Sequence, residues 1–169
     1  MGVQPPGPPD SFYLEAASGW LGLGCAQDAR EELARIAPEF QEHPAVLEVR
    51  WTLSAHEKKW AEALAIADRE MVADLTSPAG WLHRAYALRR APAGGLRPAR
   101  EALLPAAEMF PEEPVIPYNL ACYACQLERL EEARVWLRQA MRIGEKKAIQ
   151  QMALADEDLK PLWPEVIEL

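Results

Sequence analysis

The sequence is poor in cysteine, in basic residues and in long hydrophobic runs. Its 169 residues include three cysteines, an odd count that is too low for a disulfide-stapled fold. No uncharged run approaches the ~20 residues that a membrane-spanning helix needs. The first ten residues, MGVQPPGPPD, lack both a basic region and an apolar core, so we expect no secretory signal. The sequence therefore predicts a reducing, cytoplasmic setting and no membrane partner.

Acidic side chains outnumber basic ones. The chain has 26 Asp and Glu against 18 Lys and Arg, which gives a formal net charge of −8. This excess argues against nucleic acid as the main partner. Hydrophobic residues make up 50% of the chain and charged residues 26%, a globular composition. A chain of this length buries roughly 70% of the surface that it exposes when unfolded, which is enough for a sizeable core.

Runs of alternating β-branched residues are also absent, so no strand is expected. Helix-like stretches recur instead, with separations of 34, 34 and 36 residues between the residues that open them, Asp10, Pro44, Pro78 and Pro114. A second set of markers, inside later helical stretches, has separations of 34, 36 and 34 and consists of Ala29, Ala63, Ala99 and Ala133. The two sets agree if each unit is a helix, a turn and a second helix.

These markers divide the chain into four helical hairpins, 10–43, 44–77, 78–113 and 114–144. Two extra residues in the third hairpin fall near Gly94 and Gly95, in a turn where an insertion costs little. Pro105 should kink or divide the second helix of that hairpin. The amphipathic stretch 145–155 is expected to cap the last hairpin. Residues 1–9 should form an extended proline-rich arm, and residues 156–169 a turn and a short tail.

The repeat resembles the tetratricopeptide repeat (TPR) family. The fourth hairpin carries the pattern best, in Tyr118-Asn119-Leu120-Ala121 followed by Ala133, Leu137 and Ala140. In the second hairpin, Trp51 stands where the family pattern has a small residue. The resemblance implies an all-α fold, an α-solenoid of stacked antiparallel helix hairpins with a C-terminal capping helix. It also implies a concave groove lined by the first helix of each hairpin.

Residues of that groove follow from the family's spacing along the first helices. Carried onto this sequence, they are Leu14, Ser18, Glu48, Thr52, Leu82, Tyr86, Arg89, Tyr118, Cys122 and Cys125. Such a groove would bind an extended or helical segment of a protein partner. The alternative is that the C-terminal segment or the proline arm folds into the groove and buries these residues.

Signatures of catalysis and of metal binding are weak. Cys122 and Cys125 have CxxC spacing, but they fall in the middle of a helix, where no helix N-terminus lowers a thiol pKa. A zinc site needs four ligands, and the remaining candidates are scattered: Cys25, His43, His56 and His83. We therefore expect no catalytic residue, no metal and no cofactor, and interpret both cysteines as small buried side chains.

The resulting hypothesis is a non-catalytic protein–protein interaction module. One alternative is a dedicated chaperone for a secreted or assembling partner protein, and another is a thiol or metal protein that uses Cys122 and Cys125. A homo-oligomer that uses the apolar chain end around Trp163 is a further possibility. Several arginines, among them Arg84 and Arg100, could bind an anion, but pairing with neighbouring acidic residues is the more ordinary interpretation.

Overall fold

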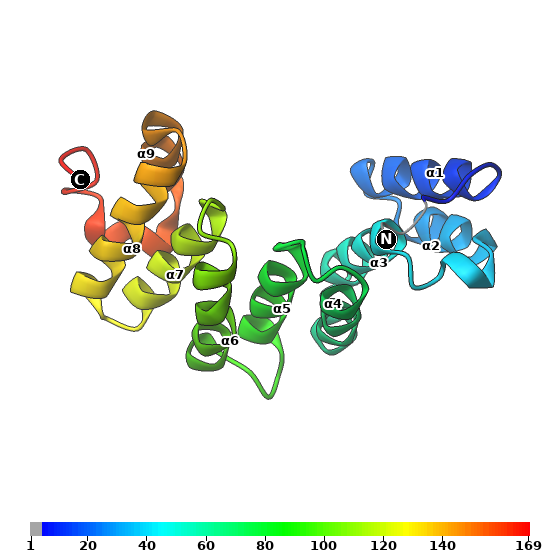
Figure 1. The fold of residues 1–169 in the computed structure, drawn as a ribbon, viewed down its shortest axis with the longest axis horizontal. Helices are drawn as coiled ribbons and strands as arrows, with labels where there is room; N and C mark the ends of the chain where they lie inside the picture. The colour runs from blue at the N-terminus through cyan, green and yellow to red at the C-terminus, as the bar shows by residue number, and fades with distance from the viewer. Residues whose placement is uncertain (1–4) are drawn as a thin grey trace. The chain divides into compact units, whose positions relative to one another are not determined.

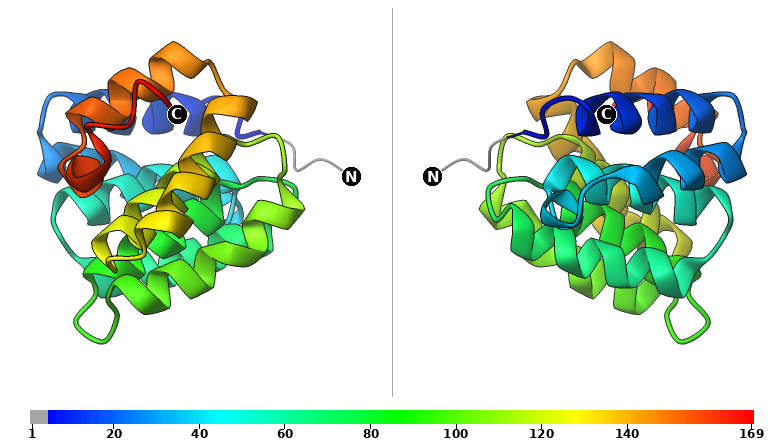
Figure 2. Two further views of the ribbon diagram at one scale, coloured as in Figure 1. Left: turned by 90° about the vertical axis from the view of Figure 1, so that its left-hand side faces the viewer. Right: turned by 90° about the vertical axis from the view of Figure 1, so that its right-hand side faces the viewer.

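The computed structural model describes residues 5–169, which are helical and contain no strand (Figures 1 and 2). Its elements are α1 (Asp10–Gly22), α2 (Ala26–Arg35), η1 (Pro38–Phe40), α3 (Pro44–His56), α4 (Trp60–Ala73), α5 (Ala79–Arg90), α6 (Leu96–Met109), α7 (Val115–Gln126), α8 (Leu130–Ile143), α9 (Lys146–Ala155) and η2 (Glu157–Leu162). The prediction of an all-α fold is confirmed. None of the described helices combines the length and apolar character that crossing a membrane requires. Residues 1–4 of the predicted arm lie outside the described part.

The chain divides into two compact units, one ending at Pro92 and the other beginning at Ala93. In the first unit, α1 packs on α2, α3 packs on α4, and α5 packs on α4. In the second unit, α7 packs against α6, α8 and η2, and α9 packs on α8. The boundary falls between α5 and α6, inside the segment 78–113 that the repeat spacing assigns to one hairpin. It adjoins the two-residue insertion at Gly94 and Gly95.

The turns of three hairpins share one backbone conformation. A residue with positive φ ends each turn: Gly24 (φ 77°), Lys58 (φ 58°) and Glu128 (φ 61°). The residue that follows has φ between −85° and −93° and ψ between 63° and 71° in all three. Lys58 and Glu128 adopt the left-handed region, which favours glycine, at the position that Gly24 holds in the first hairpin. The 34-residue spacing of the sequence therefore corresponds to a recurring turn.

The four marker alanines are fully buried. Ala29, Ala63, Ala99 and Ala133 each have 0% exposure, which agrees with their expected position at close helix–helix contacts. Pro105 lies inside α6, which continues from Leu96 to Met109 as one helix. Of the two expected effects, a kink or a division, this proline therefore does not produce the division.

Replacing Ala133 by leucine is expected to destabilise the second unit by roughly 1–3 kcal/mol, because the larger side chain overpacks a contact with no free space. Denaturant unfolding followed by circular dichroism would measure the change. Val135→Leu, at a position of the same helix that is 59% exposed, is the matched control and should change stability by less than about 0.5 kcal/mol. Equal stabilities of the two variants would contradict the close contact.

Trp51 is accommodated by an aromatic stack between two helices of the first unit. Its ring lies parallel to that of His83 on α5, with centroids 3.9 Å apart and an angle of 7° between the planes. His83 Nδ1 lies 2.7 Å from Glu70 Oε2 on α4. The Tyr86 ring stands at 72° to that of Trp51, with the two centroids 5.8 Å apart. A large residue at this position therefore bridges α3 and α5, where the family pattern has a small residue at a close contact.

Candidate functional site

A groove of about 690 Å³ lies between α1 and α3 in the first unit. Its lining comes from one face of each helix: Leu14, Glu15, Ser18, Leu21 and Gly22 from α1, and Ala45, Glu48, Val49, Thr52 and His56 from α3. The spacings of three, four and seven residues place these side chains on one face of each helix. Four residues that the sequence assigned to a groove, Leu14, Ser18, Glu48 and Thr52, are thus brought together.

The groove combines apolar side chains with unpaired acidic ones. Leu14, Leu21 and Val49 are half-buried, whereas the carboxylates of Glu15 and Glu48 are exposed. Within the described residues neither carboxylate forms an ion pair. The Ser18 hydroxyl donates to the Leu14 carbonyl at 3.0 Å, and that of Thr52 donates to the Glu48 carbonyl at 2.9 Å. Both hydroxyl donors are therefore used within their own helices.

A second hollow, of about 820 Å³, adjoins this groove through Ala45 and Glu48, which line both. It is bounded by the start of α3, the end of α4 and the start of α5. Glu70 lines it and is 6% exposed, and its Oε1 atom accepts no hydrogen bond from the described residues. The sequence reasoning missed Glu70. The available signal was a carboxylate on an apolar stripe, since Ala63, Ile66 and Ala67 precede it at helical spacing.

The α5 residues of the expected groove lie outside both hollows. Tyr86 is 39% exposed and is enclosed by other rings and a cation. The Arg90 guanidinium lies 3.5 Å above its ring centroid, and the Trp60 ring lies 6.0 Å from it. Leu82 and Arg89 are half-buried on the same helix. Tyr86 is therefore an exposed but rigid aromatic surface.

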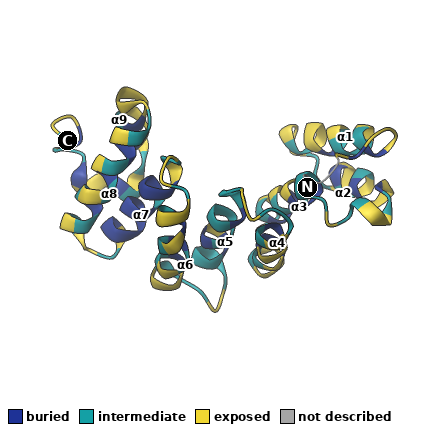
Figure 3. Ribbon diagram, viewed as in Figure 1, coloured by how far each residue is buried: buried dark blue, intermediate teal, exposed yellow. Residues whose placement is uncertain are grey.

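The expected groove residues of the fourth hairpin are covered. Tyr118, Cys122 and Cys125 are 6%, 3% and 3% exposed, and η2 packs against their helix α7, which is buried along most of its length (Figure 3). The assignment of these three residues to an open groove is therefore wrong for this structure. The alternative, in which the C-terminal segment fills the groove, holds in the second unit. The segment covers α7 because this buries the side chains of Leu159 and Leu162, both 0% exposed.

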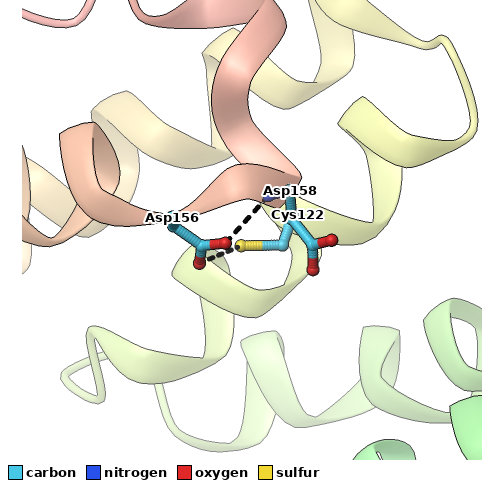
Figure 4. Close-up of side chains that lie close together, drawn as sticks. All are labelled: Cys122, Asp156 and Asp158. Atoms are coloured by element: carbon cyan, nitrogen blue, oxygen red, sulfur yellow. Dashed lines mark hydrogen bonds between the residues drawn. The ribbon is translucent and has the colours of Figure 1, made fainter.

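Asp156 fixes this covering segment to α7. Its Oδ2 atom accepts hydrogen bonds from the Tyr118 hydroxyl at 3.1 Å and from Cys122 Sγ at 3.5 Å. Its Oδ1 atom accepts from the backbone N–H of Asp158 at 2.9 Å and so caps the first turn of η2 (Figure 4). Burial raises the pKa of the Tyr118 hydroxyl, which keeps it protonated and able to donate.

The same corner could bring one thiol and two carboxylates to a metal ion. Ligand atoms of Cys122, Asp156 and Asp158 lie within 4.8 Å of one another. Both Asp156 oxygens, however, already accept hydrogen bonds that fasten η2. Cys125 adds no strong ligand, because burial, with the carboxylates of Asp158 and Asp156, raises the pKa of its thiol. The arrangement fits a structural anchor better than a metal or redox centre.

Alkylation should distinguish the cysteines. At pH 8 we expect iodoacetamide to modify the half-buried Cys25 at least tenfold faster than Cys125, since less thiolate forms at a thiol whose pKa is raised. Peptide mapping by mass spectrometry gives the two rates. The raised folded-state pKa also means that folding stability declines as pH rises past the ordinary thiol pKa of about 8.5. Rapid modification of Cys125 in the folded protein would contradict its burial.

Arginines near the end of the first unit and in the second unit are paired with acidic side chains. Arg84 Nε donates to Asp68 Oδ1 at 2.7 Å. Arg100 Nε donates to Glu132 Oε1 at 2.8 Å, and this ion pair lowers the pKa of Glu132 against the opposing effect of burial. The interpretation of these two arginines as partners of neighbouring acids is confirmed.

Comparison with known proteins establishes the fold. No protein-family model matches the chain, and no curated protein matches it. Among solved structures, the crystal structure of MamA protein is similar, with 16% sequence identity and a TM-score of 0.66 over 94% of this chain and 86% of that chain. MamA contains TPR repeats. The likeness supports a TPR-like helical-repeat fold, and at this identity it carries no information on function.

Proposed function

We propose that this chain is a non-catalytic interaction module of the TPR family, which binds a peptide or an exposed segment of a protein partner in the groove between α1 and α3. The observation that carries this proposal is the open groove itself, whose residues Leu14, Ser18, Glu48 and Thr52 match the positions that the repeat register assigns to ligand contact. Its volume of about 690 Å³ is in the range of ordinary ligand sites.

The rigidity of the groove supports the proposal. Its two walls are helices whose opposite faces enter one apolar core, which includes Ala17, Val46 and Leu53. The start of α1 is also fastened, because the buried Asp10 accepts a hydrogen bond from the backbone N–H of Ala37 at 2.6 Å. A preformed site requires little ordering on binding, so more of the contact energy appears as affinity.

The proposed contact set differs from the one that the sequence suggested. It contains Leu14, Ser18, Glu48 and Thr52, and excludes Tyr118, Cys122 and Cys125 because these are covered. Leu82, Tyr86 and Arg89 are left out as well, since they line neither hollow.

The test is a selection from random decapeptides displayed on phage, with the purified full chain as bait. Ser18→Trp is the groove-filling variant, since Ser18 is exposed and the change adds bulk without charge. We expect peptides that are enriched on the wild type and lost on Ser18→Trp. The control is Ala34→Trp, which adds the same side chain at an exposed position of α2. Circular dichroism confirms that each variant is folded. Peptides that bind the wild type and Ser18→Trp equally would refute the groove as the binding site.

A further inference from the structure

The charged residues of the groove are all of one kind. Its lining includes the carboxylates of Glu15 and Glu48 and the imidazole of His56, and no lysine or arginine of the described chain lines it. The adjoining hollow repeats this character. There Glu48, Glu70 and Asp74 supply carboxylates, His43 supplies an imidazole, and again no lysine or arginine of residues 5–169 is present. The two hollows therefore form a continuous acidic region in the first unit.

Several cations of the first unit are engaged with acidic side chains that do not line this region. Arg30 pairs with Glu57, and Arg69 pairs with Glu42. Arg35 pairs with Glu32 at 2.9 Å, and its guanidinium also lies 4.0 Å above the Tyr13 ring. The unit thus pairs several of its acidic residues outside the groove, whereas Glu15 and Glu48 have no ionic partner among the described residues.

Helix ends add to the negative potential. The helix α1 ends at Gly22, which lines the groove, and its last turn carries no basic residue. The helix α3 ends at His56, which also lines the groove and is the basic residue of its last turn. Partial negative charge at a helix C-terminus attracts cations. The groove therefore borders the partial negative charge of two helix C-termini in addition to its two exposed carboxylates.

We infer that the occupant of this groove is a basic, apolar segment, in which one or two Lys or Arg side chains stand beside aliphatic or aromatic ones. This inference rests on the proposed function. The cationic groups pair with Glu15 and Glu48, and the apolar side chains cover Leu14, Leu21 and Val49. Hydrogen bonds between ionised groups are stronger than neutral ones, and their geometry selects the ligand's register. An acidic segment would meet like charge at every ionisable position except the two histidines.

The phage selection tests this inference when the bait is the full chain in three forms: wild type, Ser18→Trp, and Glu15→Gln/Glu48→Gln. We expect the enriched decapeptides to carry Lys or Arg next to Leu, Ile, Val or Phe. The most enriched peptide is synthesised in two forms, one with its arginines and one with citrulline in their place. Fluorescence anisotropy gives the affinity of each form for the protein. Citrulline keeps the shape and removes the charge. We expect about a tenfold loss from citrulline, and a similar loss from the double glutamine variant at low salt.

A charge control separates local from general electrostatics. Glu31→Gln/Glu39→Gln removes two charges at exposed positions outside the groove and should leave the affinity within about twofold. Enrichment of neutral or acidic peptides that Ser18→Trp still abolishes would overturn the charge inference and leave the groove function intact. Enrichment that Ser18→Trp does not affect, or the absence of any enrichment, would overturn both.

Discussion

Replacing Leu159 and Leu162 together by alanine is expected to unfold the second unit at physiological temperature. Both side chains are 0% exposed where η2 packs on α7. Each truncation of a buried leucine costs about 2–5 kcal/mol, and a domain has only about 5–15 kcal/mol of stability in total. Denaturant unfolding monitored by circular dichroism gives the loss.

A second readout of this variant reports on what η2 covers. Cys122 and Cys125 should become as reactive toward iodoacetamide as Cys25, because η2 shields their helix. The matched control is Ile167→Ala, which truncates a side chain that is 72% exposed in the same C-terminal segment. That control should unfold like the wild type. A double variant with wild-type stability and protected cysteines would mean that η2 is not part of the folded core.

Gly80→Val is expected to destabilise the first unit by about 3 kcal/mol. A Cβ atom at Gly80 would lie 2.8 Å from the backbone nitrogen of Met71 and 2.8 Å from its Cγ. A backbone atom cannot rotate aside, so α5 would have to move away from α4. Hydrogen exchange measured by mass spectrometry should show faster exchange in both helices.

Gly19→Val is the control for this change. Gly19 lies inside α1 with no atom within 4 Å of an added Cβ, so the substitution tests helix propensity without a clash. We expect its stability to stay within about 0.5 kcal/mol of the wild type, since valine and glycine differ little in helix propensity. If the two variants were equally stable, the close approach of α5 to α4 would be wrong.

The helical repeat could be predicted because it depends on local and periodic features. Proline at the first helical position and alanine at the closest contacts act within a few residues of where they stand, and their spacing carries the register. The family's spacing of groove positions, carried onto the same register, gave Leu14, Ser18, Glu48 and Thr52, and these four residues line one hollow.

The covering role of the C-terminal segment could not be predicted in the same way. Leu159, Leu162 and Val166 are buried, but a proline-containing segment around them has no helical period that would mark a buried face. Which surface such a segment covers depends on contacts with residues more than thirty positions earlier. Asp156 illustrates this, since its partners Tyr118 and Cys122 precede it by 38 and 34 positions.

Glu70 shows a second limit. Its position on an apolar stripe of α4 was visible in the sequence, but its partner His83 and the stacked Trp51 come from two other helices. A single helix pattern indicates that a polar side chain faces inward. It does not indicate which side chains meet it there.

The attachment of η2 to α7 makes the C-terminal segment a tethered competitor. A segment that the chain itself supplies is present at an effective concentration of about millimolar, whatever the concentration of the protein. An outside peptide can reach Tyr118 and Cys122 only by displacing this segment, so its concentration relative to its dissociation constant must exceed that intramolecular advantage. Occupancy of the α7 surface is therefore set by the covalent continuity of the chain and does not vary with the concentration of the protein.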